Sequence, residues 1–393
     1  MERNPPVYLD HNASTPLHPA ALEVMLPWLT DGANPSSIHA AGRSARRATE
    51  AAREEVASLL GASPAEIVFT SGGTEADNLA IRGAARAACA ARPSRREIAI
   101  SAAEHPAVRE AALGLEREGF AVHELPVDPD GLQRPESADA LTPRLAVLSL
   151  ILANNETGAI DDAVPVLARR AHELGTLVHT DAVQAAGRIP VDVRALGVDL
   201  LSLSAHKLGG PKGVGALYVR KGTRLEPLAA GGGQEKGRRP GTENVAGIVG
   251  LAAAFHAASE RLAEEADRLA ALRDTFEREL LERVPGVRFN ATSSPATRRL
   301  PSVSSAVFPG AEGETLLMAL DLEGIAASTG SACASGTTAP SRVLLACGLP
   351  REDVLATLRF SFGRTTSEAD VARVLDVLPP LVARARAALS LTG

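Results

Sequence analysis

Five polar side chains of different chemistry each follow directly on a short apolar run of the sequence. They are Thr74, His105, Asn155, Asp181 and Lys207. Apolar runs of this length are typical of buried strands, and the carboxyl ends of parallel strands meet at one edge of a sheet, where ligands bind. The spacing therefore predicts one site that brings together a hydroxyl, an imidazole, an amide, a carboxylate and an amine.

The segment TSGGTEADN, residues 70–78, has the pattern of an anion site. Gly72 and Gly73 follow an apolar run and precede a predicted helix that begins at Thr74, with Asp77 in the register of a capping box. Backbone N–H groups and the helix dipole converge on a phosphate at such a turn. Glycine turns before capped helices are also common without a ligand, so this motif alone leaves both interpretations open.

Lys207 lies in SLSAHKLGGPKG, directly after the apolar run LLSLSA. A lysine at the end of a strand can lose enough solvent to lower its pKa and form a Schiff base with a carbonyl compound. Ser204 and His206 flank it and offer two further groups for a phosphate. Most lysines are solvated surface residues, and that interpretation suits Lys212, which stands between a proline and a glycine.

The segment HTDAVQAAG places Asp181 at a strand end and Gln184 three residues later. The carboxylate could pair with a protonated pyridine nitrogen and the amide could donate to a ring oxygen, although Asp181 could equally cap the next helix. In EHPAV, the imidazole of His105 could lie flat on a ring, although a lone histidine is more often structural. A phosphate site, an acid for a ring nitrogen and a Schiff-base lysine together specify pyridoxal 5′-phosphate.

A single thiol, Cys333, stands in the small-residue run STGSACASG, residues 328–336. The run has no large apolar residues to form a core, so it predicts an exposed, mobile loop, and such loops often carry function. The chain has three cysteines and no CxxC pair, which argues against a disulfide framework or a cysteine-rich zinc site. Cys89 and Cys347 lie in apolar helical stretches, where free cysteine packs like a small hydrophobe.

The elements that would position these side chains alternate along the chain. From residue 66 onward, short runs rich in Val, Ile and Leu alternate with Ala-, Arg- and Glu-rich stretches of helical period. This alternation predicts a mostly parallel sheet covered by helices on both faces, and hence an α/β fold. The predicted strand runs are EIVF, EIAIS, FAVHELPV, RLAVLSLI, TLVHTDA, LLSLSA and VGALYV.

The second half of the chain predicts a smaller unit. A Gly-rich, basic stretch over residues 221–245 predicts a long loop, and the helical stretch after it is one helix or two with a bend. The remainder, with VRFNA, SSAVF, LRFSF and a terminal helix, is typical of an α+β unit. We expect a large cofactor-binding domain over residues 16–260, and a small domain of residues 1–15 and 261–393 that carries the cysteine loop at about 326–340.

Composition places the chain among globular proteins. It has 393 residues, of which 45% are hydrophobic and 22% charged, and a net charge of −6. The mildly acidic balance, without a Lys/Arg run, argues against nucleic acid or a membrane surface as a partner. The N-terminus lacks the pattern of a signal peptide, and the most apolar run, IVGLAAAF, is too short to span a bilayer, so we expect a cytoplasmic protein.

With these motifs the sequence resembles the cysteine desulfurases of the nitrogen-fixation and iron-sulfur-cluster types, in the class V aminotransferase group of fold-type I pyridoxal phosphate enzymes. The resemblance covers nearly the whole chain. It runs through YLDHNASTP, NPSSIHAAGR, TSGGTEADN, EHPAV, ANNETG, HTDAVQAAG, DLLSLSAHKLGGPKGVGALY, GGGQEKGRRPGTENVAG, GSACASG and LRFSFGR. It implies a fold-type I transferase, with a mostly parallel sheet between helices in the large domain and a smaller α+β domain.

The resemblance also implies roles for individual residues. Lys207 would bind the cofactor covalently and take the α-proton of the substrate, Asp181 would pair with the pyridine nitrogen, and His105 would stack on the ring and assist proton transfer. Asn155, at the cofactor, and Arg359 would hold the substrate carboxylate. The other implied contacts to the cofactor are Gln184 at the phenolic oxygen, Gly73, Thr74, Ser204 and His206 at the phosphate, and Thr242 from the other subunit of a homodimer.

Arg359 also follows from the strand pattern in LRFSF. Leu358, Phe360 and Phe362 alternate onto one face, which predicts their burial, and leave Arg359 and Ser361 on the other face. A guanidinium on that face suits a carboxylate, because it donates two parallel hydrogen bonds.

For Cys333 the resemblance implies the role of catalytic nucleophile toward the sulfur of L-cysteine. The thiolate would take the sulfur as a persulfide, L-alanine would leave, and the sulfur would pass to an acceptor or iron-sulfur scaffold protein. No resident metal is implied, and Cys333 would ligate an iron-sulfur cluster only transiently.

Other interpretations stay open on the sequence alone. The same cofactor site would serve a selenocysteine lyase or another class V aminotransferase, although transamination has no use for Cys333. A non-catalytic scaffold that kept the fold is a further alternative, whereas a zinc hydrolase is disfavoured because the nine histidines show no HExxH spacing. The sulfur could go to iron-sulfur clusters, tRNA thiolation, nitrogenase maturation or DNA phosphorothioation.

Overall fold

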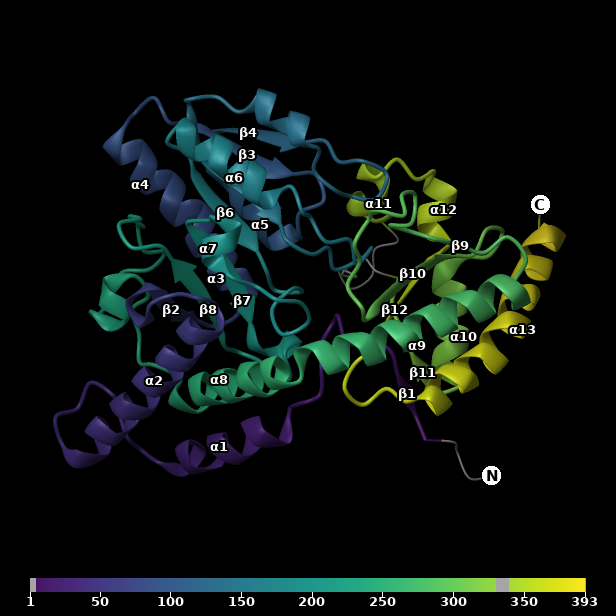
Figure 1. Ribbon diagram of the computed structural model, residues 1–393, viewed down its shortest axis with the longest axis horizontal. Coiled ribbons are helices and arrows are strands. Elements are labelled where there is room, and N and C mark those ends of the chain that lie inside the picture. Colours follow the sequence, from purple (N-terminus) through teal and green to yellow (C-terminus); the bar gives the residue numbers. More distant parts are fainter. Residues whose placement is uncertain (1–4, 330–338, 393) are drawn as a thin grey trace.

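The computed structural model describes residues 5–329 and 339–392. Its elements form a larger and a smaller group, and two long helices, α8 (Val245–Glu260) and α9 (Leu262–Arg283), run along them in succession (Figure 1). The predicted helical stretch after residue 245 is therefore two helices, which meet at Arg261. Helix α8 packs on the larger group and α9 on the smaller.

The larger group is built on a sheet that has seven strands in the described part of the chain, in the order β2-β8-β7-β6-β5-β3-β4. The pairs from β7 to β4 are parallel, and β8 is antiparallel to both of its neighbours. The strands are β2 (Ile67–Thr70), β3 (Glu97–Ser101), β4 (Ala121–Leu125), β5 (Leu145–Ile151), β6 (Leu177–Asp181), β7 (Leu200–Ser204) and β8 (Gly215–Val219). Each predicted strand run coincides with one of them to within a residue or two at its ends, so the predicted α/β fold is confirmed.

Helices cover both faces of this sheet, because alternate strand residues point to opposite sides. Leu148 and Leu201 belong to a hydrophobic cluster shared with α2, α6 and α8, whereas Val147 and Leu200 belong to one shared with α3, α4 and α5. Among the described helices, none is long and apolar enough to cross a membrane. The helices of this group besides α8 are α1 (Pro19–Thr30), α2 (Ala40–Leu59), α3 (Gly73–Asn78), α4 (Ala84–Ala91), α5 (Pro106–Leu113), α6 (Val164–Glu173) and α7 (Val193–Leu196).

The smaller group holds an antiparallel sheet in the order β12-β10-β9 and a parallel pair, β1 with β11. Its helices surround a core in which Phe276 packs against Phe360 and Phe362, with ring centroids 4.9 and 5.7 Å away. Its elements besides α9 are β1 (Val7–Tyr8), β9 (Arg288–Phe289), β10 (Val303–Val307), α10 (Gly313–Leu322), β11 (Ile325–Ala326), α11 (Arg342–Ala346), α12 (Arg351–Leu355), β12 (Thr357–Ser361) and α13 (Glu368–Thr392). The domain boundaries after residues 15 and 260 stay a prediction.

The carboxyl ends of the parallel strands meet at one edge of the large sheet. Strand β2 joins them there, because it is antiparallel to β8 and β8 is antiparallel to β7. The strands that end at this edge in front of a predicted site residue finish at Thr70, Ser101, Ile151, Asp181 and Ser204. The fold therefore delivers the predicted site residues that follow these strands, Thr74, His105, Asn155, Asp181 and Lys207, to one side of the sheet.

The core of the smaller group gives a first testable prediction. Phe276 is fully buried, and Phe276→Ala leaves a cavity beside Phe360, so we expect the free energy of unfolding to fall by about 3–5 kcal/mol in urea titrations. Leu281→Ala, on the same helix but 58% exposed, is the matched control and should change it little. Equal losses in the two variants would contradict this packing.

Candidate active site

One cavity of about 540 Å³ lies at the edge where the parallel strands end. Ser328 and Thr329 also line it, and they are the last described residues before the segment that holds Cys333. Cys333 itself lies outside the described residues, and Thr242, in an exposed loop before α8, does not line the cavity. Ten residues predicted for the site do line it: Gly73, Thr74, His105, Asn155, Asp181, Gln184, Ser204, His206, Lys207 and Arg359.

Lys207 enters this cavity from a short 3-10 turn, Ala205–Lys207, that follows β7. Its Nζ donates a hydrogen bond to the carbonyl oxygen of Asn12 at 2.5 Å and to that of Ala13 at 2.7 Å. The amine is thus held by backbone acceptors of the N-terminal segment, far away in the sequence.

The surroundings of Lys207 favour the neutral amine. Burial, with smaller effects from the cations Arg188 and Arg359, lowers the pKa of Lys207 to about 8, while Asp10 and Asp181 act in the opposite direction. A lysine with this pKa has a much larger neutral fraction at pH 7–8 than an exposed one, and the neutral amine is the nucleophile.

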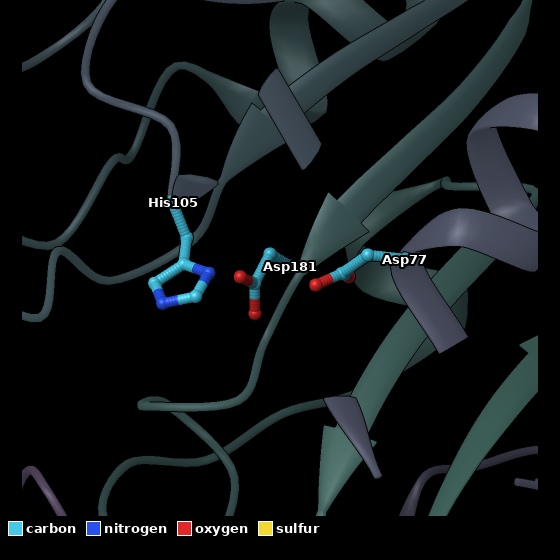
Figure 2. Close-up of side chains that lie close together, drawn as sticks. All are labelled: Asp77, His105 and Asp181. Carbon is cyan, nitrogen blue, oxygen red and sulfur yellow. The ribbon is translucent and has the colours of Figure 1, made fainter. Parts of the chain in front are cut away.

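Asp181, the last residue of β6, lies between His105 and Asp77 (Figure 2). Its Oδ1 accepts a hydrogen bond from the N–H of Val183 at 2.8 Å. Burial raises the pKa of Asp181, so its charged form is costly unless a cation lies against it. A protonated ring nitrogen in the cavity would supply such a cation.

His105 is the N-cap residue of α5. Its Nδ1 accepts a hydrogen bond from the N–H of Ala107 at 3.1 Å, which leaves Nε2 as the protonated nitrogen of the neutral ring. Burial lowers the pKa of His105, so this neutral form prevails at neutral pH. The ring can therefore donate from Nε2.

The ligating atoms of Asp77, His105 and Asp181 lie within 4.8 Å of one another, which is compact enough for a metal ion (Figure 2). Lys207 and Arg359 line the same cavity, and their positive charges repel a metal cation. The group is better suited to an organic cation that shares the cavity with an anion.

The predicted start of the helix after TSGG needs a correction. Helix α3 begins at Gly73, not Thr74, and Asp77 does not form a capping box. Its carboxylate is buried at the cavity, with Oδ1 at 3.6 Å from His179 Nε2. Glu75 turns back instead and accepts a hydrogen bond from the N–H of Ser71 at 2.7 Å. The predicted helix start was thus one residue late, and the acid that turns back to the preceding backbone lies two positions before Asp77.

The wall formed by Gly73, Ser204 and His206 is suited to an anion. A Cβ on Gly73 would lie 2.9 Å from Val183 Cγ2, so the wall there is bare backbone. Burial, together with the nearby charge of Lys207, lowers the pKa of His206 to about 4, which keeps the ring neutral and able to donate one hydrogen bond.

Arg359 reaches the cavity from β12 in the smaller group. Leu358, Phe360 and Phe362 are buried in the core, as predicted, and Arg359 lies on the other face. Its Nη1 donates to the carbonyl oxygen of Asn155 at 2.9 Å. The guanidinium thus comes from the smaller group of elements, and the carbonyl oxygen of Asn155 comes from the larger one.

A second contact of Arg359 was not predicted, because it involves the N-terminal segment. Nη2 of Arg359 lies 2.8 Å from Asp10 Oδ1, and Asn12 Nδ2 donates to the carbonyl oxygen of Asn155 at 3.0 Å. Asp10, Asn12 and Ala13 all line the cavity. The motif YLDHNASTP contains them, but it has no periodicity, so it does not indicate which of its residues face a site.

Sequence reasoning also missed a buried polar chain behind Asp181. Ser149 Oγ donates to Glu104 Oε1 at 2.9 Å and lies 2.9 Å from His179 Nδ1, and His179 Nε2 lies 2.9 Å from Ser202 Oγ. Burial lowers the pKa of His179 to about 3, so this ring is neutral, and burial raises the pKa of Glu104 well above its usual range, which disfavours its charged form. The signal was a polar residue in the middle of each of three adjacent apolar runs, at Ser149, His179 and Ser202.

The other two cysteines have the environments predicted for them. Cys347 is buried, and burial raises the pKa of its thiol to about 12, which makes it a poor nucleophile. Cys89 is half-buried against the cluster under α4.

Comparison with known proteins shows the family. The family model described as aminotransferase class-V matches residues 7–374. A cysteine desulfurase of Cereibacter sphaeroides is 50% identical over 98% of this chain and 97% of that protein. The chain belongs to the cysteine desulfurases of the class-V aminotransferase family. A cysteine desulfurase of Gluconacetobacter diazotrophicus is 48% identical over 97% of this chain and 94% of that protein.

The fold of this cysteine desulfurase matches as well. A solved structure described as a NifS-like protein superposes with a TM-score of 0.88, at 36% identity, over 96% of this chain and 100% of that one. The predictions of fold class, enzyme class and activity are therefore confirmed.

Pyridoxal 5′-phosphate is the cofactor of this family, and the cavity of the desulfurase fits it. Lys207 offers a nucleophilic amine, and the buried Asp181 gains from a cationic ring nitrogen. Gly73 leaves a wall without a side chain, beside Ser204 and His206, for an anionic group.

The lowered pKa of Lys207 can be measured directly. We expect acylation of Lys207 in the cofactor-free protein, followed by mass spectrometry over a pH series, to reach half its maximal rate near pH 8. The reason is that the neutral amine reacts and the ammonium does not. A lysine-containing peptide in the same solution provides the solvated reference, and a Lys207 midpoint near 10.5 would contradict this description of the site.

Proposed function

We propose that this enzyme takes the sulfur of L-cysteine as a persulfide on Cys333, releases L-alanine and passes the sulfur to a protein acceptor. The observation that carries the proposal is the convergence of Lys207, Asp181 and Arg359 in one cavity, which is also lined by Ser328 and Thr329, a few residues before Cys333 in the sequence. The proposed roles divide between two hydrophobic clusters, one formed by residues 52–255 together with Leu300 and Val303, and one that joins Val7 and Leu9 to residues 269–385.

Cofactor binding uses the residues of the larger unit. Lys207 binds the cofactor covalently, Asp181 holds its ring nitrogen and His105 lies on its ring. When bound, pyridoxal 5′-phosphate withdraws the electrons of the α-carbanion of the substrate. The other proposed contacts are Asn155 at the cofactor, Gln184 at the ring oxygen, and Gly73, Thr74, Ser204 and His206 at the phosphate.

Substrate recognition uses the junction of the two units. Arg359 and Asn155 hold the carboxylate of L-cysteine, and a guanidinium suits it because two parallel N–H groups match two oxygens. Asp10 holds Arg359 in place from the other side, at 2.8 Å. Lys207 takes the proton from the α-carbon, which needs the neutral amine that its lowered pKa provides.

Sulfur transfer uses the Cys333 thiolate. It attacks the Sγ of the substrate, an S–S bond forms and the C–S bond breaks. The electron pair of the broken bond stays on the carbon skeleton, which takes up a proton and leaves as L-alanine. Transfer of the outer sulfur to an iron-sulfur scaffold protein regenerates the thiol.

The setting of the reaction is a homodimer in the cytoplasm. Thr242 adds to the phosphate site of the partner subunit, which agrees with its exposed position away from the cavity of its own subunit. Three cysteines without a CxxC pair suit a reducing compartment.

The role of Cys333 is tested by Cys333→Ala. We expect alanine and persulfide formation from L-cysteine to fall by several orders of magnitude, because the sulfur loses its acceptor, while the cofactor absorbance band stays. Cys89→Ala is the control and should keep the parent rate. Sulfur release by the Cys333 variant at the parent rate would overturn the proposed mechanism.

The role of Thr242 is tested with mixed dimers. We co-express Lys207→Ala with Thr242→Val under different tags and purify dimers that hold one copy of each. If Thr242 serves the partner, one site of the mixed dimer is intact and about half of the parent activity returns. If Thr242 serves its own subunit, no site is intact, and the mixed dimer is no more active than half of the Thr242→Val homodimer.

A further inference from the structure

Arg188 is a half-buried arginine that the proposed mechanism does not use. It follows the turn after β6, and its guanidinium reaches across to the N-terminal segment. Nη1 donates to Asn12 Oδ1 at 2.7 Å, and Nη2 donates to the carbonyl oxygen of His11 at 3.2 Å. These bonds fix the side of the segment opposite Ser361 of β12, which accepts hydrogen bonds from the N–H groups of His11 and Asn12.

The same guanidinium also contacts two residues of the larger unit. Nη1 donates to Gln184 Oε1, and Nη2 lies 3.4 Å from the carbonyl oxygen of Lys207. Gln184 in turn donates from Nε2 to the carbonyl oxygen of Asn12 at 3.1 Å. One planar group thus connects the N-terminal segment, the turn of Gln184 and the backbone of Lys207.

The tie to Asn12 bears directly on the amine of Lys207. The carbonyl oxygens of Asn12 and Ala13 each accept a hydrogen bond from Nζ. If the N-terminal segment moves, these acceptors move with it. Arg188 therefore acts on the amine through the segment it holds.

The charge of Arg188 acts in the same place. No carboxylate of the described residues forms an ion pair with it, and burial together with Arg359 lowers its pKa only to about 10, so it is a cation at neutral pH. Lys207 faces the cations Arg188 and Arg359 and the anions Asp10 and Asp181, and Arg188 is the larger of the two cationic effects that lower the pKa of Lys207.

We propose that Arg188 is a positioning residue for Lys207: its guanidinium fixes the carbonyl groups that hold the amine and keeps a positive charge beside it. This inference rests on the proposed role of Lys207 in binding the cofactor. Arg188 makes four polar contacts to three segments and has no carboxylate partner among the described residues. An arginine that served packing alone would need neither feature.

Three variants separate the geometry from the charge. Arg188→Met removes both, Arg188→Lys keeps the charge and loses the planar fork, and Asn12→Ala removes one partner of the fork. Arg194→Met, an exposed arginine on α7, is the matched control. The chain has four lysines, so acylation of Lys207 is easily resolved from that of Lys212, Lys221 and Lys236 by mass spectrometry.

The first readout is the pH midpoint of Lys207 acylation in the cofactor-free protein. We expect Arg188→Met to raise the midpoint by about 1 unit, which makes acylation at pH 7.5 roughly tenfold slower. Arg188→Lys should restore a midpoint close to that of the parent. The proposal would be overturned if Arg188→Met had the same acylation midpoint as the parent protein, or if Arg194→Met raised the midpoint as much as Arg188→Met does.

The second readout is the affinity of the cofactor-free protein for pyridoxal 5′-phosphate, followed by absorbance. We expect it to fall about tenfold in Arg188→Met and also to fall in Arg188→Lys, because the charge alone does not hold the segment. If Arg188→Met binds pyridoxal 5′-phosphate as tightly as the parent protein does, the positioning role is overturned, whatever the pH midpoint of Lys207 acylation in that variant. If the Met variant does not fold, Arg188→Lys and Asn12→Ala carry this test in the same way.

A double variant tests the route through Asn12. If Arg188 acts through this residue, Arg188→Met with Asn12→Ala binds the cofactor about as tightly as Arg188→Met alone. Losses that add in full would overturn that route. None of these measurements needs L-cysteine or Cys333, so they stand if the sulfur chemistry fails, and an unchanged cofactor band in Lys207→Ala would show instead that the role of Lys207 is wrong.

Discussion

The site depends on keeping the amine of Lys207 out of bulk water without pairing it to a single carboxylate. An ammonium in such a place is costly, so the neutral form gains, and the pKa falls to about 8. The compensation comes from two backbone carbonyls of residues 12 and 13. Because these residues continue from β1, which pairs with β11 of the smaller group, the reactive amine depends on an element that belongs to the other core.

The charges around the cavity are separated in space. Asp77 and Asp181 lie at the carboxyl ends of the large sheet, and burial raises both pKa values, so this side accepts a cation readily. Arg359 and Arg188 lie on the side of the N-terminal segment. A ligand with a cationic ring at one end and a carboxylate at the other fits this division, as expected of a bound pyridine ring that carries an amino acid.

The features that the sequence predicts best are the positions of the strands and the residues that follow them. The apolar runs located all seven strands of the described large sheet, the ends of five of these runs indicated residues that share one cavity, and a period of two in LRFSF added Arg359. Prediction from the sequence fails where contacts are long-range and have no period: Asn12 meets Asn155 across 143 positions, and Arg188 meets Asn12 across 176. The prediction at the start of α3 failed for another reason: Asp77, the acid expected in the capping box, is buried at the cavity, and Glu75, two positions earlier, turns back to the N–H of Ser71.

Strand β12 shows how the smaller core sets the position of a substrate-binding group. Residues 358 and 360 bury their side chains in the core, and Arg359, between them, points into the cavity because a strand alternates its faces. A shift of the core by one residue would turn Arg359 inward and a phenylalanine toward the substrate. The register with β10, where Ser305 pairs with Arg359, prevents that shift. The packing of Phe276 on this strand therefore fixes the orientation of Arg359 as well as contributing to stability.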